Sequence, residues 1–180
     1  LMERWGIQEV YGMHNWPGLP VGRFAIRAGG FFAATDEFDI TITGKGGHAA
    51  KPHDTVDPSV VAAQTVLALQ SIVARSVDPV GQAVVSVTAM ETSSTAYNVI
   101  PQSVRLRGTV RTLDSDVRAL VEPRLIALAE GTAQAFGAVA EVDYRKGYPV
   151  MVNAADQTEF AAYVARGVSG QCDRAPLVMG

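Results

Sequence analysis

Three histidines are the side chains of this sequence with the widest choice of chemistry, and each lies in a stretch rich in glycine or proline. An imidazole can bind a metal, donate or accept a hydrogen bond, or transfer a proton near neutral pH. His14 lies in the run YGMHNWPG, residues 11–18. A lone histidine close to tryptophan and proline is more often structural than a ligand, so spacing alone leaves both interpretations of His14 open.

His48 lies in the run GKGGHAAKPH, residues 44–53, which also contains His53. Its three glycines allow either a close approach of the backbone to a neighbour or a positive φ. They are not spaced as in a phosphate-binding loop, and the two histidines are five residues apart, unlike the i, i+4 metal pair of a helix. The run is therefore a candidate binding loop, and the role of His53 stays open.

Two further polar residues stand at the ends of an expected strand, Asn98 before it and Arg111 at its end. Residues in such places usually serve turns and solvent. Both types can also hold a carboxylate, arginine through its two-pronged guanidinium. Asn98 and Arg111 are therefore candidate substrate-binding residues.

The elements that must position these residues follow from the hydrophobic pattern. Strict alternation predicts strands over residues 37–43, 83–89, 103–111 and 138–145. Helical spacing predicts one helix that begins after Asp57 and continues through Arg75, with Ala62, Val66, Leu69 and Val73 facing the core. A second helix is expected from Asp114 to Gly137, with a stripe that includes Val117, Val121, Leu125, Leu128 and Phe136. Pro123 predicts a kink or a late start in it.

The order strand, helix, strand, strand, helix, strand predicts an α+β fold. We expect a ferredoxin-like βαββαβ domain over residues 35–147, with a four-stranded antiparallel sheet and two helices on one face. The flanking segments, 1–34 and 148–180, have no sheet of their own to join. They should need a part that the chain lacks, or pack on the domain as irregular arms.

Composition narrows the classes of partner. The net charge of −3 offers no attraction to a polyanion, so we expect no nucleic-acid partner. No apolar run approaches the ~20 residues that span a bilayer, and the N-terminus has no signal-peptide layout, so we expect no membrane partner and a cytoplasmic location. The charged fraction of 18% is low, either because the core is rich in alanine and valine or because a missing domain or second subunit covers an apolar face. The single cysteine, Cys172, rules out an internal disulfide.

Three motifs, taken together and in this order, carry a family resemblance. They are HNWPGLPVG at residues 14–22, GKGGHAA at 44–50 followed by PH and DP, and AYNVIP at 96–101 leading to GTVR at 108–111. The chain resembles the amidohydrolase branch of the aminoacylase and carboxypeptidase-type two-metal peptidases. That branch includes hippurate hydrolases, N-acyl-amino-acid amidohydrolases and auxin-conjugate hydrolases, and the resemblance runs over nearly the whole chain.

The resemblance implies a role for each candidate residue. His14 matches a ligand of one of two divalent metals, zinc, manganese or similar ions. His48 matches the lid histidine that reaches into the partner subunit's active site and stabilises the oxyanion, while Asn98 and Arg111 match lid residues that recognise the substrate carboxylate. The implied chemistry is attack of a metal-activated water on the amide carbonyl of an N-acyl amino acid.

The resemblance also implies how the chain is organised. Residues 35–147 would be a lid and dimerisation domain of a homodimer, 1–34 a catalytic-domain segment carrying His14, and 148–180 the start of the return to the catalytic domain. The other metal ligands of the family lie before and after this stretch, so we expect an inactive fragment that binds no metal tightly by itself. Ser93 and Ser94 replace a glycine pair of many relatives, which puts the shape of that loop in doubt.

Two other functions are consistent with the fold that we expect. The chain could be a stand-alone ferredoxin-like module that binds a small molecule, or a purely structural dimerisation unit. A metal-ligand motif around His14 has no purpose in a stand-alone sensing module, which favours the enzyme. The structural unit differs only in whether His48, Asn98 and Arg111 face a ligand.

Overall fold

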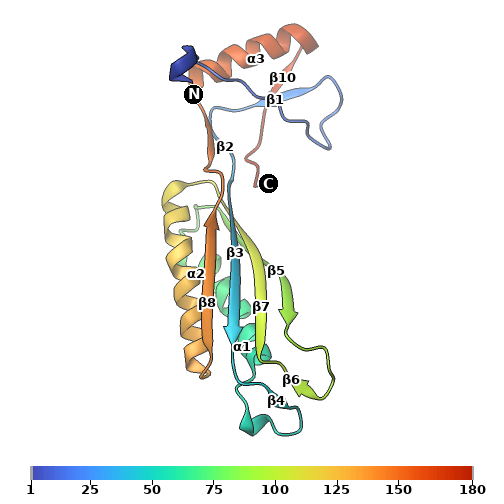
Figure 1. Ribbon diagram of the computed structural model, residues 1–180. Coiled ribbons are helices and arrows are strands. Elements are labelled where there is room, and N and C mark those ends of the chain that lie inside the picture. The colour runs from blue at the N-terminus through green and yellow to red at the C-terminus, as the bar shows by residue number, and fades with distance from the viewer. Residues whose placement is uncertain (1, 180) are drawn as a thin grey trace. The chain divides into compact units, whose positions relative to one another are not determined.

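A computed structural model describes residues 2–179. The chain divides into two compact units, Leu1–Phe31 with Val152–Leu177 and Phe32–Met151 with Val178–Gly180 (Figure 1). The architecture is α+β, as expected. No helix in the part of the chain described here has the length and apolar character needed to cross a bilayer.

Four antiparallel strands form the sheet of the second unit, in the order β5-β7-β3-β8. Their bounds are β3 Ala34–Thr43, β5 Ala83–Thr92, β7 Ser103–Thr112 and β8 Val139–Lys146. Each overlaps one of the four expected strands. At the centre of the sheet Gly108 pairs with Phe38, and an added Cβ would lie 2.1 Å from the Phe38 ring, so only glycine fits there.

Two long helices cover one face of this sheet, α1 Pro58–Ser71 and α2 Ser115–Ala135. The Asp57 carboxylate caps α1 by accepting from the Ser59 N–H at 2.8 Å. Asp114 caps α2 in the same way, and α2 begins at this cap and continues through Pro123, which is exposed. Of the kink or late start expected at Pro123, the late start was therefore wrong. The helix ends before Gly137, whose φ of +77° favours glycine.

The core lies between these helices and the sheet. The largest fully buried side chains come from both layers: Phe38, Ile40, Ile42, Leu106, Leu69, Ile72 and Leu125. Two expected core residues were wrong, since Val73 and Phe136 are exposed. After Ser71 the chain continues as a π-helical turn, η3 Ile72–Ser76. Ile72, three residues after the buried Leu69, takes the core position instead of Val73. Phe136 lies beyond the last turn of α2, where Ala133 takes the buried position.

Asp36 is buried at the start of β3, where it joins β3, α2 and the end of β8. Its carboxylate accepts hydrogen bonds from Arg118 at 3.1 and 2.5 Å, from the Tyr144 hydroxyl at 2.8 Å and from the Gly147 N–H at 3.1 Å. Burial alone would raise the pKa of Asp36, but these bonds outweigh it and hold the pKa below its usual value.

The first unit contains the flanking segments and has a small sheet of its own. Strands β1 Phe24–Ile26 and β10 Cys172–Arg174 pair in parallel, and α3 Ala155–Ser169 and the short η1 Glu3–Trp5 belong to the same unit. The expectation that these segments have no sheet to join was therefore wrong, because they pair with each other. A second pair, β2 Gly29–Phe32 with β9 Met151–Asn153, lies at the boundary of the two units.

Candidate functional site

His48 and Asn98 lie next to each other in the second unit. A two-stranded ribbon, β4 Gly47–His48 and β6 Val99–Ile100, pairs His48 with Val99, and the Ala49 N–H donates to the Asn98 carbonyl at 2.9 Å. A short helix, η2 Pro52–Asp54, follows the ribbon and carries His53, whose Nε2 lies 3.7 Å from Asp54. The structure therefore brings together two of the residues singled out from the sequence.

The three glycines of the His48 loop serve close backbone approach. An added Cβ would lie 2.2 Å from the Val56 carbonyl at Gly44, 2.8 Å from the Ile100 carbonyl at Gly46, and 2.7 Å from the Thr55 methyl at Gly47. None of the three has a positive φ. Of the two alternatives that the sequence left open, the close approach is the one that the structure shows.

One hydrogen bond fixes the tautomer of the His48 ring. The Ala50 N–H donates to His48 Nδ1 at 3.1 Å, so Nδ1 carries a lone pair and the proton of the neutral ring is on Nε2. No hydrogen bond to Nε2 occurs within residues 2–179, and the side chain is exposed. His48 therefore presents an Nε2–H donor to whatever approaches this loop.

Arg111 lies far from His48 in the same chain. It stands near the end of β7, opposite Thr35 and Val84, whereas the loop of His48 begins at the other end of the sheet, where Thr43 pairs with Ser103. Ser103 and Arg111 are eight residue steps apart along the strand, roughly 27 Å. One small molecule cannot contact both His48 and Arg111 of a single chain.

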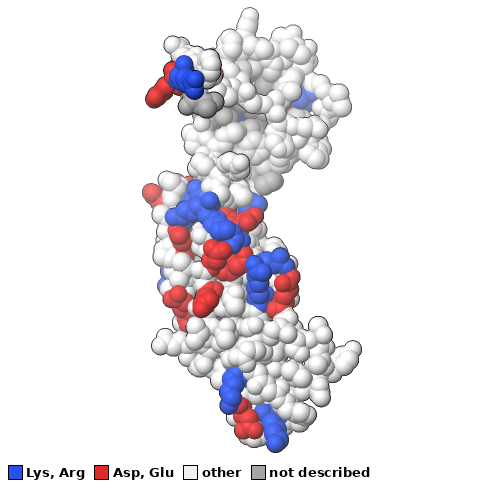
Figure 2. Space-filling view, viewed as in Figure 1, with Lys and Arg blue, Asp and Glu red and all other residues white. Residues whose placement is uncertain are grey.

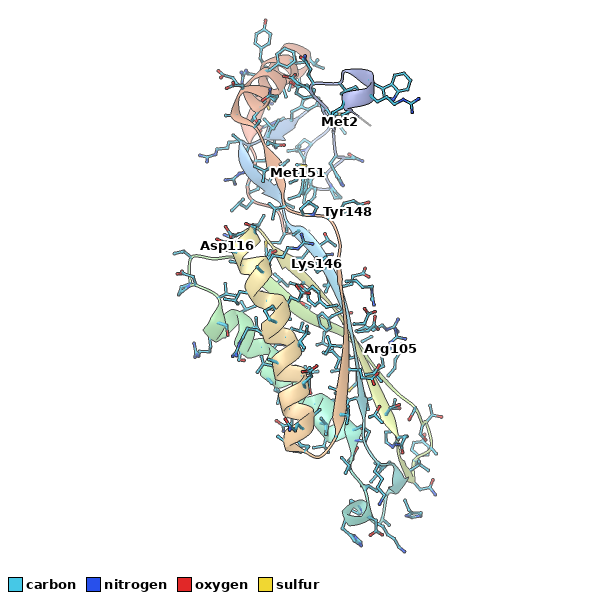
Figure 3. All side chains as sticks on the ribbon, turned by 60° about the vertical axis from the view of Figure 1, so that its left-hand side comes forward. Met2, Arg105, Asp116, Lys146, Tyr148 and Met151 are labelled. Carbon is cyan, nitrogen blue, oxygen red and sulfur yellow. The ribbon has the colours of Figure 1, made fainter. Side chains whose placement is uncertain are left out.

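Lys and Arg side chains lie among Asp and Glu over the four-stranded sheet (Figure 2), and Arg105 is one of them (Figure 3). Arg111, six residues after Arg105 on β7, points to the same helix-free face of the sheet. Asp39, almost fully buried on this face, accepts from Arg105 at 2.7 Å and from Arg145 at 2.6 Å. These bonds outweigh the effect of burial and lower the pKa of Asp39. Arg107 pairs with Glu91.

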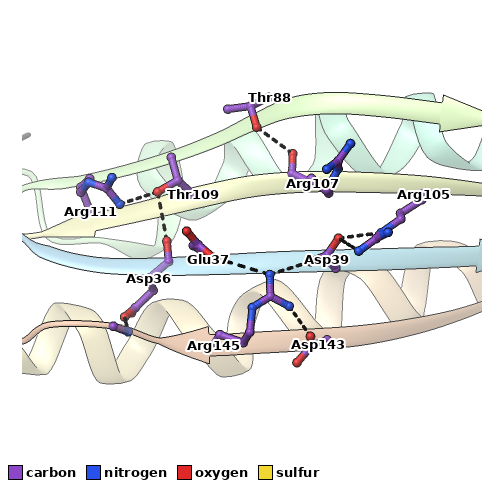
Figure 4. A network of polar contacts seen from close by, with 11 residues as sticks. Asp36, Glu37, Asp39, Thr88, Arg105, Arg107, Thr109, Arg111, Asp143 and Arg145 are labelled. Atoms are coloured by element: carbon purple, nitrogen blue, oxygen red, sulfur yellow. Dashed lines mark hydrogen bonds and ion pairs between the residues drawn. The ribbon is translucent and has the colours of Figure 1, made fainter.

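Unlike these neighbours, Arg111 has no carboxylate partner within residues 2–179 (Figure 4). Its Nη1 donates to the Thr109 hydroxyl and, at 3.2 Å, to the Val110 carbonyl. The guanidinium is therefore held in place by neutral groups and keeps its charge available for an anion.

His14 lies in the first unit and is exposed. Its Nδ1 lies 2.6 Å from the Asn15 carbonyl, which can only accept, so Nδ1 carries the proton and Nε2 the lone pair. This is the state of a metal-ligating imidazole, which donates its other N–H to a carbonyl or carboxylate. Within residues 2–179 no group of three or more histidine, cysteine, aspartate or glutamate side chains could hold a metal.

Two residues that the motifs did not single out as site residues hold the His48 loop. The Gln102 side chain bonds to Gly44 and Gly46, and the Ser93 hydroxyl accepts from the N–H groups of Gln102 and Ser103. Ser93, which stands where many relatives have a glycine, therefore fixes the start of the segment before Asn98 by hydrogen bonds. In the sequence Gln102 is marked only by its place directly after the AYNVIP motif. A polar residue in such a place is typical of a turn, so no sequence pattern singles it out.

Comparison with known proteins identifies the chain's relatives. A family model described as "Peptidase dimerisation domain" matches residues 35–134. The chain is 43% identical over 148 residues to N-acetyl-L-cysteine deacetylase of Bacillus subtilis, covering 82% of this chain and 35% of that protein. It is 40% identical over 177 residues to N-acetyldiaminopimelate deacetylase of Enterococcus faecalis, covering 97% and 47%.

A solved structure gives the same result. The B. subtilis YXEP protein, described as a dinuclear metal binding peptidase from the M20 family, matches with a TM-score of 0.73 and 31% identity over 99% of this chain and 45% of that one. This chain thus spans less than half the length of these relatives. Because the family model covers more than half of the chain, the chain belongs to the M20 family of peptidases, as a carrier of its dimerisation domain.

Proposed function

We propose that this chain is the lid and dimerisation part of a longer, metal-dependent amidohydrolase that cleaves the amide bond of N-acyl amino acids or related small conjugates. Relatives named as deacetylases of N-acetyl amino acids and as N-acyl-L-amino acid amidohydrolase support this substrate class. Residues 35–147 would be a ferredoxin-like lid, and 1–34 and 148–180 would belong to the catalytic domain.

The observation that carries the proposal is the hydrogen bond that fixes the His48 ring. Nδ1 is occupied by the Ala50 N–H, so an exposed Nε2–H remains as a donor. An oxyanion that develops on an amide carbonyl needs such a donor, and preorganised donors are typically worth ~2.7–4 kcal/mol in the transition state. His48 would therefore direct a donor at the oxyanion.

Arg111 and Asn98 would recognise the substrate's carboxylate. Arg111 is held by Thr109 and by the Val110 carbonyl and has no carboxylate partner within residues 2–179, so it can pair with an anion without breaking an existing ion pair. Asn98 carries an amide that can donate to the same group, and its backbone carbonyl is fixed beside His48.

His14 would hold one of two divalent metals through Nε2, with the remaining ligands supplied by parts of the longer protein. When bound, such metals polarise a carbonyl and lower the pKa of water. The bond between Nδ1 and the Asn15 carbonyl orients the ring for this role.

We infer a homodimer formed through β5, for a reason that lies in the two edges of the sheet. One edge, β8, carries Glu141, Asp143, Arg145 and Lys146, the kind of charges that keep an edge strand from pairing. The other edge, β5, has no charge from Ala83 to Met90. The helix α1, which packs on β5, also exposes Val60 and Leu67.

Such a dimer would bring His48 of one subunit close to Arg111 of the other, although the two residues lie far apart within one chain. Antiparallel pairing of β5 with its copy places the Ala83 end of one strand level with the Thr92 end of the other. Arg111 pairs beside the first end, at Val84, and the ribbon of His48 and Asn98 lies beyond the second. Arg111 of one subunit would then face His48 of the partner subunit.

The proposal is tested with substrate pairs in the longer enzyme that carries this chain. We expect N-acetyl amino acids to be hydrolysed in the presence of zinc or manganese, and their C-terminal carboxamides at least about tenfold less efficiently in kcat/KM. In Arg111→Ala this preference should disappear, whereas Arg107→Ala, which removes an arginine already paired with Glu91, should keep it. A metal-loaded enzyme that hydrolyses no N-acyl amino acid would overturn the proposal.

A further inference from the structure

The Gln102 side chain makes two hydrogen bonds to the backbone of the His48 loop, residues 44–50, and we call this pair of bonds the clip. Its Oε1 accepts from the Gly46 N–H at 3.0 Å, and its Nε2 donates to the Gly44 carbonyl at 2.8 Å. The Gln102 backbone carbonyl also accepts from the Gly44 N–H at 3.0 Å. Because an N–H can only donate and a carbonyl only accept, these partners fix the orientation of the amide.

The clip is anchored to the sheet through Ser93, the residue that follows β5. The Ser93 hydroxyl accepts from the N–H groups of Gln102 and Ser103, both at 3.1 Å, and the Ser93 N–H donates to the Ser103 carbonyl at 3.0 Å. Gln102 is thereby tied to the adjoining ends of β5 and β7. The position of the loop is set from the rigid part of the domain.

The loop needs this support because its own sequence gives it little. Gly44, Gly46 and Gly47 have no side chains to pack, and glycine loses more conformational freedom on ordering than any other residue. The ribbon of β4 and β6 contains only two residue pairs, Gly47 with Ile100 and His48 with Val99. Beyond them, the bond that orients the His48 ring depends on where the backbone places Ala50.

We propose that Gln102 is a positioning residue for His48: its side-chain amide, anchored by Ser93, fixes the glycine-rich backbone that carries the His48 ring. This inference rests on the proposed role of His48 as an oxyanion donor. Gln102 touches neither substrate nor metal in this assignment. It acts only through the path Gly44, Gly46 and His48.

The chemistry of the clip selects the variants that test it. The clip needs an acceptor and a donor at the same time, which an amide provides and neither a thioether nor a carboxylate does. Gln102→Met keeps the length of the side chain and removes both bonds. Gln102→Glu keeps the acceptor for Gly46 and turns a second oxygen toward the Gly44 carbonyl. A matched control is Gln70→Met, because among residues 2–179 the Gln70 amide bonds only to the Val66 carbonyl in its own helix.

The first measurement uses the chain itself and needs no activity. Long-range ¹H–¹⁵N correlation spectra report the tautomer of each of the three histidines, and hydrogen exchange reports the Gly46 amide. In the unchanged chain we expect His48 as the Nε2–H tautomer. In Gln102→Met the Gly46 amide should exchange at least about fivefold faster, and the His48 signals should shift toward a mixture of tautomers. Gln70→Met should change neither, and a His48 ring unaffected by Gln102→Met would overturn the proposal.

The second measurement is kinetic, in the longer enzyme. A loosened donor weakens transition-state stabilisation, so Gln102→Met should lower kcat between about tenfold and a hundredfold with KM within about twofold. Added to His48→Ala, it should lower kcat no further, because the residue that it positions is already gone. If His48→Ala leaves kcat unchanged, the proposed function of His48 is wrong. If His48→Ala lowers kcat and Gln102→Met does not, the positioning role alone is overturned.

Discussion

At the scale of single residues, His48 and Arg111 would act at different stages of one reaction. An oxyanion exists only beyond the ground state, so His48→Ala should lower kcat by about a hundredfold or more and change KM little. The substrate's carboxylate is present from binding to product release, so Arg111→Ala should act mainly on KM. Steady-state kinetics of both variants in the longer enzyme measure this division.

The controls for these two variants come from the same strands. Arg107→Ala removes a cation of the same sheet face that already pairs with Glu91, and it should leave kcat and KM close to their original values. A His48→Ala enzyme whose loss lies entirely in KM would contradict the oxyanion role. An Arg111→Ala enzyme with an unchanged KM would contradict carboxylate binding.

Asp36 gives a residue-scale prediction about stability. Asp36→Asn leaves Arg118 without its buried partner, so we expect a loss of about 3 kcal/mol in the free energy of unfolding. Asp143→Asn, in which the replaced carboxylate is largely exposed, is the control and should cost less than about 1 kcal/mol. Urea unfolding of both variants, followed by circular dichroism, checks this.

The pH dependence of stability should change in the same variant. The pKa of Asp36 is lower in the folded than in the unfolded chain, so the unfolded state takes up the proton first as the pH falls. Its stabilising contribution is complete above the ordinary carboxyl pKa, near ~3.9, and is lost as the pH falls through the lower value of the folded state. Asp36→Asn should therefore lose less stability than the original chain between about pH 5 and pH 2. An equally steep loss would contradict this assignment.

At the scale of elements, the contrast between β5 and β8 predicts which edge pairs. Met90 on β5 and Val139 on β8 are both exposed apolar side chains on edge strands. Met90→Lys puts a charged side chain on the pairing edge of each subunit and should raise the dimer dissociation constant by at least about tenfold. Val139→Lys adds the same charge to the other edge and should leave dimerisation unchanged. Sedimentation equilibrium of the chain distinguishes them, and the reverse order would place the interface at β8.

How far the elements could be predicted from the sequence depends on how local their signals are. The four strands of the sheet and the helix starts after Asp57 and Asp114 were predictable, because alternation and capping residues lie within each segment. The pairing of β1 with β10 was not, because it joins Phe24 to Cys172. Helical spacing also could not choose between Ile72 and Val73, because they follow the buried Leu69 by three and four residues and both fit that spacing.

The same limit applies to the site. Motifs identified His48, Asn98 and Arg111, but they could not place Arg111 at the opposite end of the sheet from the other two. That separation follows from strand register, which has no signature within any one motif. Gln102 escaped for a related reason, because its two partners lie 56 and 58 residues away along the chain.

At the scale of the whole molecule, metal affinity should depend on parts outside this chain. His14 presents one lone pair, and a two-metal site needs several ligands, so the chain should show no stoichiometric zinc or manganese binding at submicromolar concentration. Isothermal titration of the chain, with His14→Ala as the control, measures this. Tight binding that His14→Ala abolishes would mean that the chain holds a complete metal site of its own.

The last prediction concerns which subunit supplies which residue. His48→Ala removes the oxyanion donor of the lid and leaves the metal ligands intact. His14→Ala removes a metal ligand and leaves His48 intact. Each homodimer of the longer enzyme should therefore be nearly inactive. In a mixed dimer with sites shared across the two-fold axis, one intact metal site faces one intact His48. Random exchange makes half of the dimers mixed with one working site in each, so activity should return to about a quarter of the original.

If His48 worked within its own subunit, no mixed dimer would hold a complete site. Mixed dimers whose exchange is confirmed by mass spectrometry, and which still show no turnover, would therefore place His48 in its own subunit's site.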